Sequence, residues 1–168
     1  MKKLALFIAV LFAFSLGVVA SRLALKPAAA STPAMPSAGW TLHIDALKHF
    51  GSGHPAQVAH HWCKAVAGGL LECQIYDSDA ANARLIEIET IVPAAVYKAF
   101  SKSEQALWHY HRTEIPKVSA TLPGMPVAQQ KKVVASLLET YGKLWLLWNP
   151  LDTKGGWPTG TPRVVVLK

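Results

Sequence analysis

Five of the seven histidines in this sequence fall into two short stretches. The first stretch holds His54, His60 and His61, and the second holds His109 and His111, with Glu114 close behind. Imidazole is the commonest metal ligand in proteins and also a frequent general base, because it exchanges its proton near neutral pH. These two stretches are therefore the first place where the sequence indicates chemistry.

The spacing within the second stretch fits one shared ion. If this segment is extended, His109 and His111 project to the same side and offer two imidazoles together. Glu87 and Glu89 also project together from a neighbouring segment. Two or three imidazoles with a carboxylate suit zinc, iron, manganese or copper. The candidate metal ligands are His60, His61, Glu89, His109 and His111.

Two interpretations of these histidines stay open. Taken one at a time, each is more simply a capping, surface or hydrogen-bonded core residue. Taken together, they form one site for a metal or a small molecule. His60 and His61 are neighbours and would point about 100° apart on a helix, so only one of them is expected to join the distant pair. His61 is expected to face inward and His60 to lie nearer the solvent.

The elements that must position these residues begin with a predicted helix over residues 55–67. Pro55 suits a first helical position, Gly68 and Gly69 suit a helix end, and apolar residues recur at helical spacing between them. Residues 70–76 and 83–92 alternate as strands, separated by turn residues from Asp77 to Asn82. The second of these strands carries both Glu87 and Glu89 on one face.

The second half of the sequence predicts mostly short elements. Residues 94–100 favour a helix, and Ser101 followed by Glu104 has the form of a capping box for another. Residues 108–115 are ambiguous between a helix end and an extended chain. A longer helix is predicted over residues 126–141, ended by Gly142, followed by strands at 144–148 and 163–168. This order favours one α+β domain, with a small, mostly antiparallel sheet packed with several helices.

Cys63 and Cys73 are the only cysteines. A disulfide between them would stabilise the domain by roughly 2–4 kcal/mol in an oxidising compartment. Two buried thiols are the alternative, and the residues alone favour neither. Their separation excludes a Cys-x-x-Cys redox motif.

The N-terminus predicts export. Lys2 and Lys3 precede an uncharged apolar run from Leu4 to Ala20, which is typical of a signal peptide, or of a signal anchor if it is not cleaved. Residues 21–39 are rich in Ala, Pro and Ser and form a predicted linker. Residues 40–168 form the globular domain, expected in the periplasm or outside the cell, or tethered to the inner membrane by the uncleaved segment.

The net charge limits the classes of molecule that the chain is expected to bind. The four basic residues before Ala30 supply four of the formal +7, which leaves +3 for the rest of the chain. That excess includes no basic stripe with interleaved aromatics, so nucleic acid is excluded as a partner. A membrane or lipid surface remains open, because mild positive charge and exposed tryptophans favour one. Protein partners are not indicated.

Several blocks of the sequence resemble the oil body-associated protein family. They are His60-His61-Trp62-Cys63-Lys64, Cys73-Gln74-Ile75-Tyr76-Asp77-Ser78-Asp79, Asn82-Ala83-Arg84-Leu85-Ile86 with Glu89, Trp108-His109-Tyr110-His111 and Tyr141-Gly142-Lys143. The blocks follow the family's order over residues 40–168. The N-terminal segment lies outside the resemblance and predicts an exported bacterial member.

The resemblance implies an association with lipid droplets for the plant-type relatives, and it supplies no catalytic residues. The family's motif positions fall on the same His60, His61, Glu89, His109 and His111. Because cytosolic relatives match at the cysteines, the resemblance favours thiols over a disulfide. Two functions follow as expectations: an exported domain that binds a metal or small molecule, or a non-catalytic protein of lipid or envelope surfaces.

Overall fold

The computed structural model describes residues 38–48 and 57–167. The predicted signal segment, nearly all of the predicted linker, and His54 lie outside these ranges. Within the described ranges, none of the helices has the length and apolar character needed to cross a bilayer.

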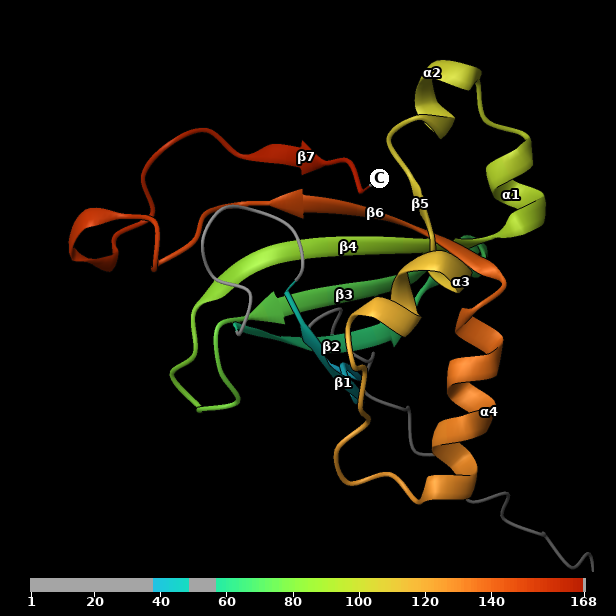
Figure 1. Ribbon diagram of the computed structural model, residues 1–168, viewed down its shortest axis with the longest axis horizontal. Coiled ribbons are helices and arrows are strands. Elements are labelled where there is room, and N and C mark those ends of the chain that lie inside the picture. The colour runs from blue at the N-terminus through green and yellow to red at the C-terminus, as the bar shows by residue number, and fades with distance from the viewer. Residues whose placement is uncertain (1–37, 49–56, 168) are drawn as a thin grey trace, which may run out of the picture. The chain divides into compact units, whose positions relative to one another are not determined.

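A seven-stranded sheet organises the described domain (Figure 1). Its strands are β1 Leu42–Leu47, β2 Val58–Ala65, β3 Leu71–Tyr76, β4 Leu85–Pro93, β5 His109–Tyr110, β6 Thr140–Leu146 and β7 Arg163–Val165. The order is β1-β2-β3-β4-β6-β5, with β7 also paired to β6, and all these pairs are antiparallel. This architecture confirms the predicted α+β class.

The described chain also contains four α-helices and three 3-10 turns. They are α1 Ala94–Lys98, α2 Lys102–Gln105, α3 His111–Glu114 and α4 Val127–Leu137, with 3-10 turns η1 Ala67–Gly69, η2 Ile115–Lys117 and η3 Lys154–Gly156. Ile115 of η2 and Val133 of α4 pack against the buried core of the sheet. The Ser101 hydroxyl caps α2 by accepting from the Glu104 backbone N–H (3.2 Å), as predicted.

The register defines two faces of the sheet. Residues opposite each other in an antiparallel pair project to the same side, and neighbours along a strand project to opposite sides. The inner face carries the core residues Cys63, Cys73, Ile75 and Leu144, and the outer face carries the alternate residues. Glu89 is opposite Cys73 and Leu144, so its side chain belongs to the inner face.

The predicted helix over residues 55–67 is wrong in its described part. Residues 58–65 form β2, which lies between β1 and β3 and pairs with β1 over residues 58–63 and with β3 over residues 60–65. The apolar residues fit a helical period, but Ala59, His61 and Cys63 also fit the alternation of a strand. Pairing on both sides decides between the two periods, and sequence spacing alone does not contain that information.

The end of the predicted helix over residues 126–141 also differs. α4 ends at Leu137, and β6 begins at Thr140, four residues before the predicted strand. Gly142 does not end a helix; it lies within β6 opposite Ile91 and His109. The strands predicted at 70–76 and 83–92 and the helix predicted at 94–100 are confirmed with small changes of boundary.

The cysteines form a disulfide. Cys63 and Cys73 are directly opposite each other in the β2–β3 pair and are bonded. The preference for thiols that came from the family resemblance is therefore wrong. The bond links two central strands from the inner face of the sheet.

Candidate metal centre

A cavity of about 100 Å³ lies between the inner face of the sheet and the segments α3, η2 and α4. Most of its lining is apolar, with contributions such as Ile91, Ile115 and Leu137. Its ionisable lining residues are Lys48, His61, Glu87, Glu89, His109, His111 and Glu114. A largely apolar space with a few convergent polar groups is the usual form of a binding site.

Two histidines meet one carboxylate oxygen in this cavity. The Oε1 atom of Glu89 lies 3.1 Å from Nε2 of His109 and 3.2 Å from Nε2 of His111. All three side chains are buried, with 7–8% of their surface exposed. Burial alone would raise the pKa of Glu89, but the hydrogen bonds from His109 and His111 outweigh it, so the pKa lies well below its usual range. The carboxyl group is therefore ionised in the folded protein.

The hydrogen bonds around His111 show that its Nδ1 atom carries a proton. The Thr140 hydroxyl donates its only proton to the Leu137 carbonyl oxygen (2.6 Å). The contact of 2.8 Å between Thr140 Oγ1 and His111 Nδ1 must then be donated by the imidazole. With Nδ1 protonated, Nε2 of His111 faces Glu89 either as the second N–H of an imidazolium or as a lone pair. A lone pair against a carboxylate is favourable only with a cation between them.

One nitrogen of His109 has no hydrogen-bond partner among the described residues. Its Nδ1 atom is buried and accepts or donates no hydrogen bond within the described part of the chain. Buried polar atoms are nearly always paired with protein, water or a bound group. A water molecule or a bound group would satisfy this atom.

Gly142 of β6 leaves the space in which the side chains of Glu89 and His109 meet. A Cβ atom built there would overlap Oε1 of Glu89 and come within 2.6 Å of Nε2 of His109. The absence of a side chain at this position of β6 is what allows Glu89 and His109 to approach each other. Glycine here serves close approach, not an unusual backbone angle.

A second charged pair lies in the same cavity. Lys48 Nζ and Glu87 Oε1 form an ion pair, and both side chains are almost fully buried. Burial raises the pKa of Glu87, and the Lys48 charge partly offsets that rise. Glu114 also lines the cavity, and its Oε1 atom accepts a hydrogen bond from Lys117 Nζ at 3.0 Å.

The structure divides the histidines that the sequence singled out. His61 lines the cavity, and its Nδ1 atom lies within hydrogen-bond distance of the carbonyl oxygens of Ala59 (3.0 Å) and Ile44 (3.2 Å). It stays outside the group whose ligand atoms converge, which contains Glu89, His109 and His111. His60 is the next residue along β2 and lies on the outer face, in a different group.

Sequence reasoning missed several residues of both groups. Thr140 and Gly142 support the inner group, and His43, Asp45 and Asp79 accompany His60 on the outer face. The His-x-Asp spacing of His43 and Asp45 was the available signal, because residues two apart share a face of a strand. This spacing is informative only if residues 42–47 form a strand, which the sequence pattern did not predict.

Fold and site together describe a small α+β domain with a buried His–His–Glu group under an antiparallel sheet. Residues 34–167 match the family described as "Protein of unknown function (DUF1264)", and the chain belongs to that family. The expected resemblance to oil body-associated proteins is confirmed by relatives of that name.

Two of these relatives indicate the extent of the similarity. Oil body-associated protein 2B of Zea mays is 37% identical over 113 residues, which cover 67% of this chain and 45% of the relative. Oil body-associated protein 1B of Arabidopsis thaliana is 35% identical over 125 residues, covering 74% of this chain and 52% of the relative. The chain thus spans about half the length of these relatives. No solved structure matches it.

Proposed function

We propose that this domain binds a divalent transition metal through Glu89, His109 and His111. The observation that carries the proposal is the convergence of both Nε2 atoms on Glu89 Oε1, at 3.1 and 3.2 Å. Ligand atoms of a tetrahedral zinc site, with bonds of about 2.0–2.1 Å, are separated by roughly 3.3 Å. The three ligand atoms need little movement to surround an ion.

The donor set fits the metals expected from the sequence. Two imidazoles and one carboxylate suit zinc, iron, manganese or copper. Thr140 supports the arrangement, because metal-binding histidines usually donate their second N–H to a fixed acceptor. Three protein ligands leave at least one position for water or a small molecule from the adjoining cavity. A metal there would supply Lewis acidity or an activated water.

The competing explanation is an ion-pair cluster without metal, in which Glu89 is neutralised by a protonated histidine. The two explanations differ in metal content. Full-length protein is dialysed against Zn²⁺, freed of excess ion, and analysed for bound metal per chain. We expect Glu89→Gln and His109→Ala each to bind one equivalent fewer than the unaltered chain.

Glu114→Gln is the matched control, since it makes the same carboxylate-to-amide change in the same cavity outside the converging group. It should keep the full metal content. If Glu89→Gln and His109→Ala, confirmed as folded by circular dichroism, bind as much zinc as Glu114→Gln, the proposed function is wrong.

Export is a separate part of the proposal. The apolar N-terminal run supports it, and so does the bond between Cys63 and Cys73, because such bonds persist mainly in oxidising compartments. Fusing the first 39 residues to a reporter that is active only outside the cytoplasm tests this. A reporter that stays inactive with the native segment, although active behind a known signal, contradicts export.

A second candidate function is association with a lipid surface, which the names of the oil body-associated relatives favour. Leu151 and Trp157, in the segment between β6 and β7, have 56% and 72% of their surface exposed. Exposed aromatic and aliphatic side chains are suited to lipid interfaces. Flotation of the purified chain with anionic and with neutral vesicles tests this function. Binding that Trp157→Ser reduces supports it, and failure to float with either vesicle excludes it.

A further inference from the structure

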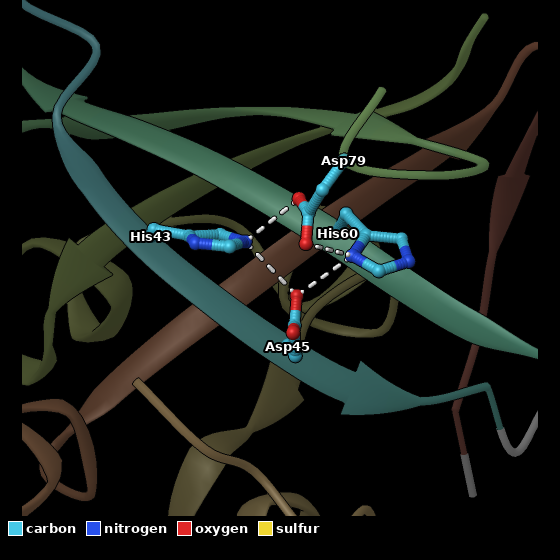
Figure 2. Close-up of side chains that lie close together, drawn as sticks. All are labelled: His43, Asp45, His60 and Asp79. Atoms are coloured by element: carbon cyan, nitrogen blue, oxygen red, sulfur yellow. Dashed lines mark hydrogen bonds and ion pairs between the residues drawn. The ribbon is translucent and has the colours of Figure 1, made fainter. Parts of the chain in front are cut away.

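We propose a second metal site, on the outer face of the sheet, in which His43, Asp45, His60 and Asp79 hold a divalent cation of the zinc type. Figure 2 shows the four side chains pointing toward one another from three separate segments of the chain. Their ligand atoms all lie within 4.8 Å of one another. This site is independent of the group at Glu89.

Three segments build the site. Asp45 of β1 and His60 of β2 are directly opposite each other in the β1–β2 pair, so their side chains project to one face. His43 is two residues before Asp45 and shares that face. Asp79 comes from the turn between β3 and β4, whose ends are held together by Asp77 Oδ2 and Arg84 Nε at 2.6 Å.

The contacts form a closed ring of alternating nitrogen and oxygen ligands. His43 Nε2 lies 3.0 Å from Asp45 Oδ1 and 2.9 Å from Asp79 Oδ1. His60 Nδ1 lies 2.8 Å from the same Asp45 Oδ1 and 3.0 Å from Asp79 Oδ2. Figure 2 draws these four contacts as dashed lines. Four ligands of this kind, each nitrogen beside both carboxylates, have the composition of a tetrahedral zinc site.

Hydrogen bonding does not explain the ring by itself. The His60 Nδ1 atom is buried, and among the described residues it makes no well-formed hydrogen bond despite its two short contacts with carboxylate oxygens. A cation bound between His60 and the two carboxylates would give this nitrogen a partner. The two contacts with Asp45 Oδ1, of 3.0 and 2.8 Å, need to lengthen by only roughly 0.3–0.5 Å to match the separation of neighbouring ligand atoms in a tetrahedral zinc site.

The charges of the two carboxylates also favour a bound cation. Asp45 and Asp79 bring two negative charges into one small space, and like charges this close are unfavourable without a compensating cation. A divalent ion would neutralise both and leave the imidazoles neutral, which is the form in which they bind metals. The site would thus become neutral on loading.

The site is also held in place and open to solvent. The His43 ring stacks on the Trp62 ring, with centroids 4.2 Å apart and planes 6° from parallel. The side chains are partly exposed, from 12% for His43 to 40% for Asp79, so an ion can enter without unfolding. A bound ion would join β1, β2 and the β3–β4 turn, which stabilises the edge of the sheet.

Neighbouring residues of β2 supply a matched test. His60→Asn removes a ligand of the outer group, while His61→Asn makes the same change on the inner face. Full-length protein is titrated with Zn²⁺ by calorimetry and with Co²⁺, whose visible absorption reports tetrahedral ligands. We expect His60→Asn and Asp79→Asn to lose one zinc equivalent or to bind it about 10- to 100-fold more weakly. His61→Asn and Glu89→Gln should keep the outer equivalent.

Asp79→Asn keeps the test decisive, because this side chain lies on an exposed turn and its replacement does not disturb the core. Zinc should raise the melting temperature of Glu89→Gln, which lacks a ligand of the inner group, and should not raise that of the Glu89→Gln/Asp79→Asn double variant. If folded His60→Asn and Asp79→Asn bind zinc with the stoichiometry and affinity of the unaltered chain, the four residues are an ion-pair cluster and the proposal is wrong.

Discussion

Gly142 and His109 lie directly opposite each other in the β5–β6 pair, and the His109 ring and the Glu89 carboxylate occupy the space that a side chain at position 142 would need. The identity of residue 142 therefore controls the inner group as directly as the ligands do. A substitution at this glycine tests the geometry without removing any ligand.

Gly142→Ala should destabilise the domain by about 1–3 kcal/mol, because the new methyl group overlaps Glu89 and His109. Urea denaturation measures the loss, and zinc binding at the inner group should fall with it. In a Glu89→Ala/His109→Ala background the same substitution should cost clearly less, since the overlapping atoms are gone. An equal cost in both backgrounds would mean that the strain arises elsewhere in β6.

Glu89→Gln should destabilise the metal-free protein by about 3 kcal/mol at pH 7, because two imidazoles lose their charged acceptor. The pKa of Glu89 in the folded protein lies below its ordinary value of 4.5. The ionised carboxylate therefore stabilises the fold above that pH, and the contribution is lost as the pH falls further. Urea titrations in chelator from pH 7 to pH 3 should show the two proteins converging in acid. A constant difference would contradict this assignment.

Lys48→Met should cost about 3 kcal/mol, because it leaves Glu87 in the cavity without its cation. Replacing both residues, as Lys48→Met/Glu87→Leu, should recover most of that loss, since apolar groups then fill the space. Thermal and urea unfolding of the two single variants and the double variant measure the coupling. Additive losses would show that the two side chains do not depend on each other.

Reduction of the Cys63–Cys73 bond should lower the free energy of unfolding by roughly 2–4 kcal/mol. Denaturation with and without dithiothreitol measures the change. The Cys63→Ala/Cys73→Ala variant is the control and should not respond to the reductant. A response of the control equal to that of the unaltered chain would assign the effect to something other than this bond.

The sequence predicted best where local patterns act alone. The strands at β3 and β4 alternate clearly and are separated by turn residues from Asp77 to Asn82, so their pairing follows from short-range signals. The Ser101 cap likewise depends on residues three apart. The placement of Glu87 and Glu89 on one side of β4 followed from the same alternation.

The sequence-based prediction failed for segments whose structure depends on pairing with strands that are distant in the sequence. Residues 58–65 fit a helical and a strand period equally, and only contact with both β1 and β3 selects the strand. The same contact separates His60 from His61, which an assumed helix would have placed on nearly adjacent faces. Convergence of His109 and His111 on Glu89 was expected from an extended segment. It occurs instead where β5 passes into α3, and the start of a helix at His111 is not visible in the spacing.

With metal bound at both proposed sites, the two faces of β2 would differ in how fast they exchange it. On one side, partly exposed ligands would follow the ion concentration of the surroundings and release their metal quickly to a chelator. On the other side, ligands enclosed by α3 and α4 would exchange only when those helices open, and would hold whatever was bound at folding. The consecutive residues His60 and His61 would then belong, respectively, to a rapidly exchanging site and to the surroundings of a slowly exchanging one.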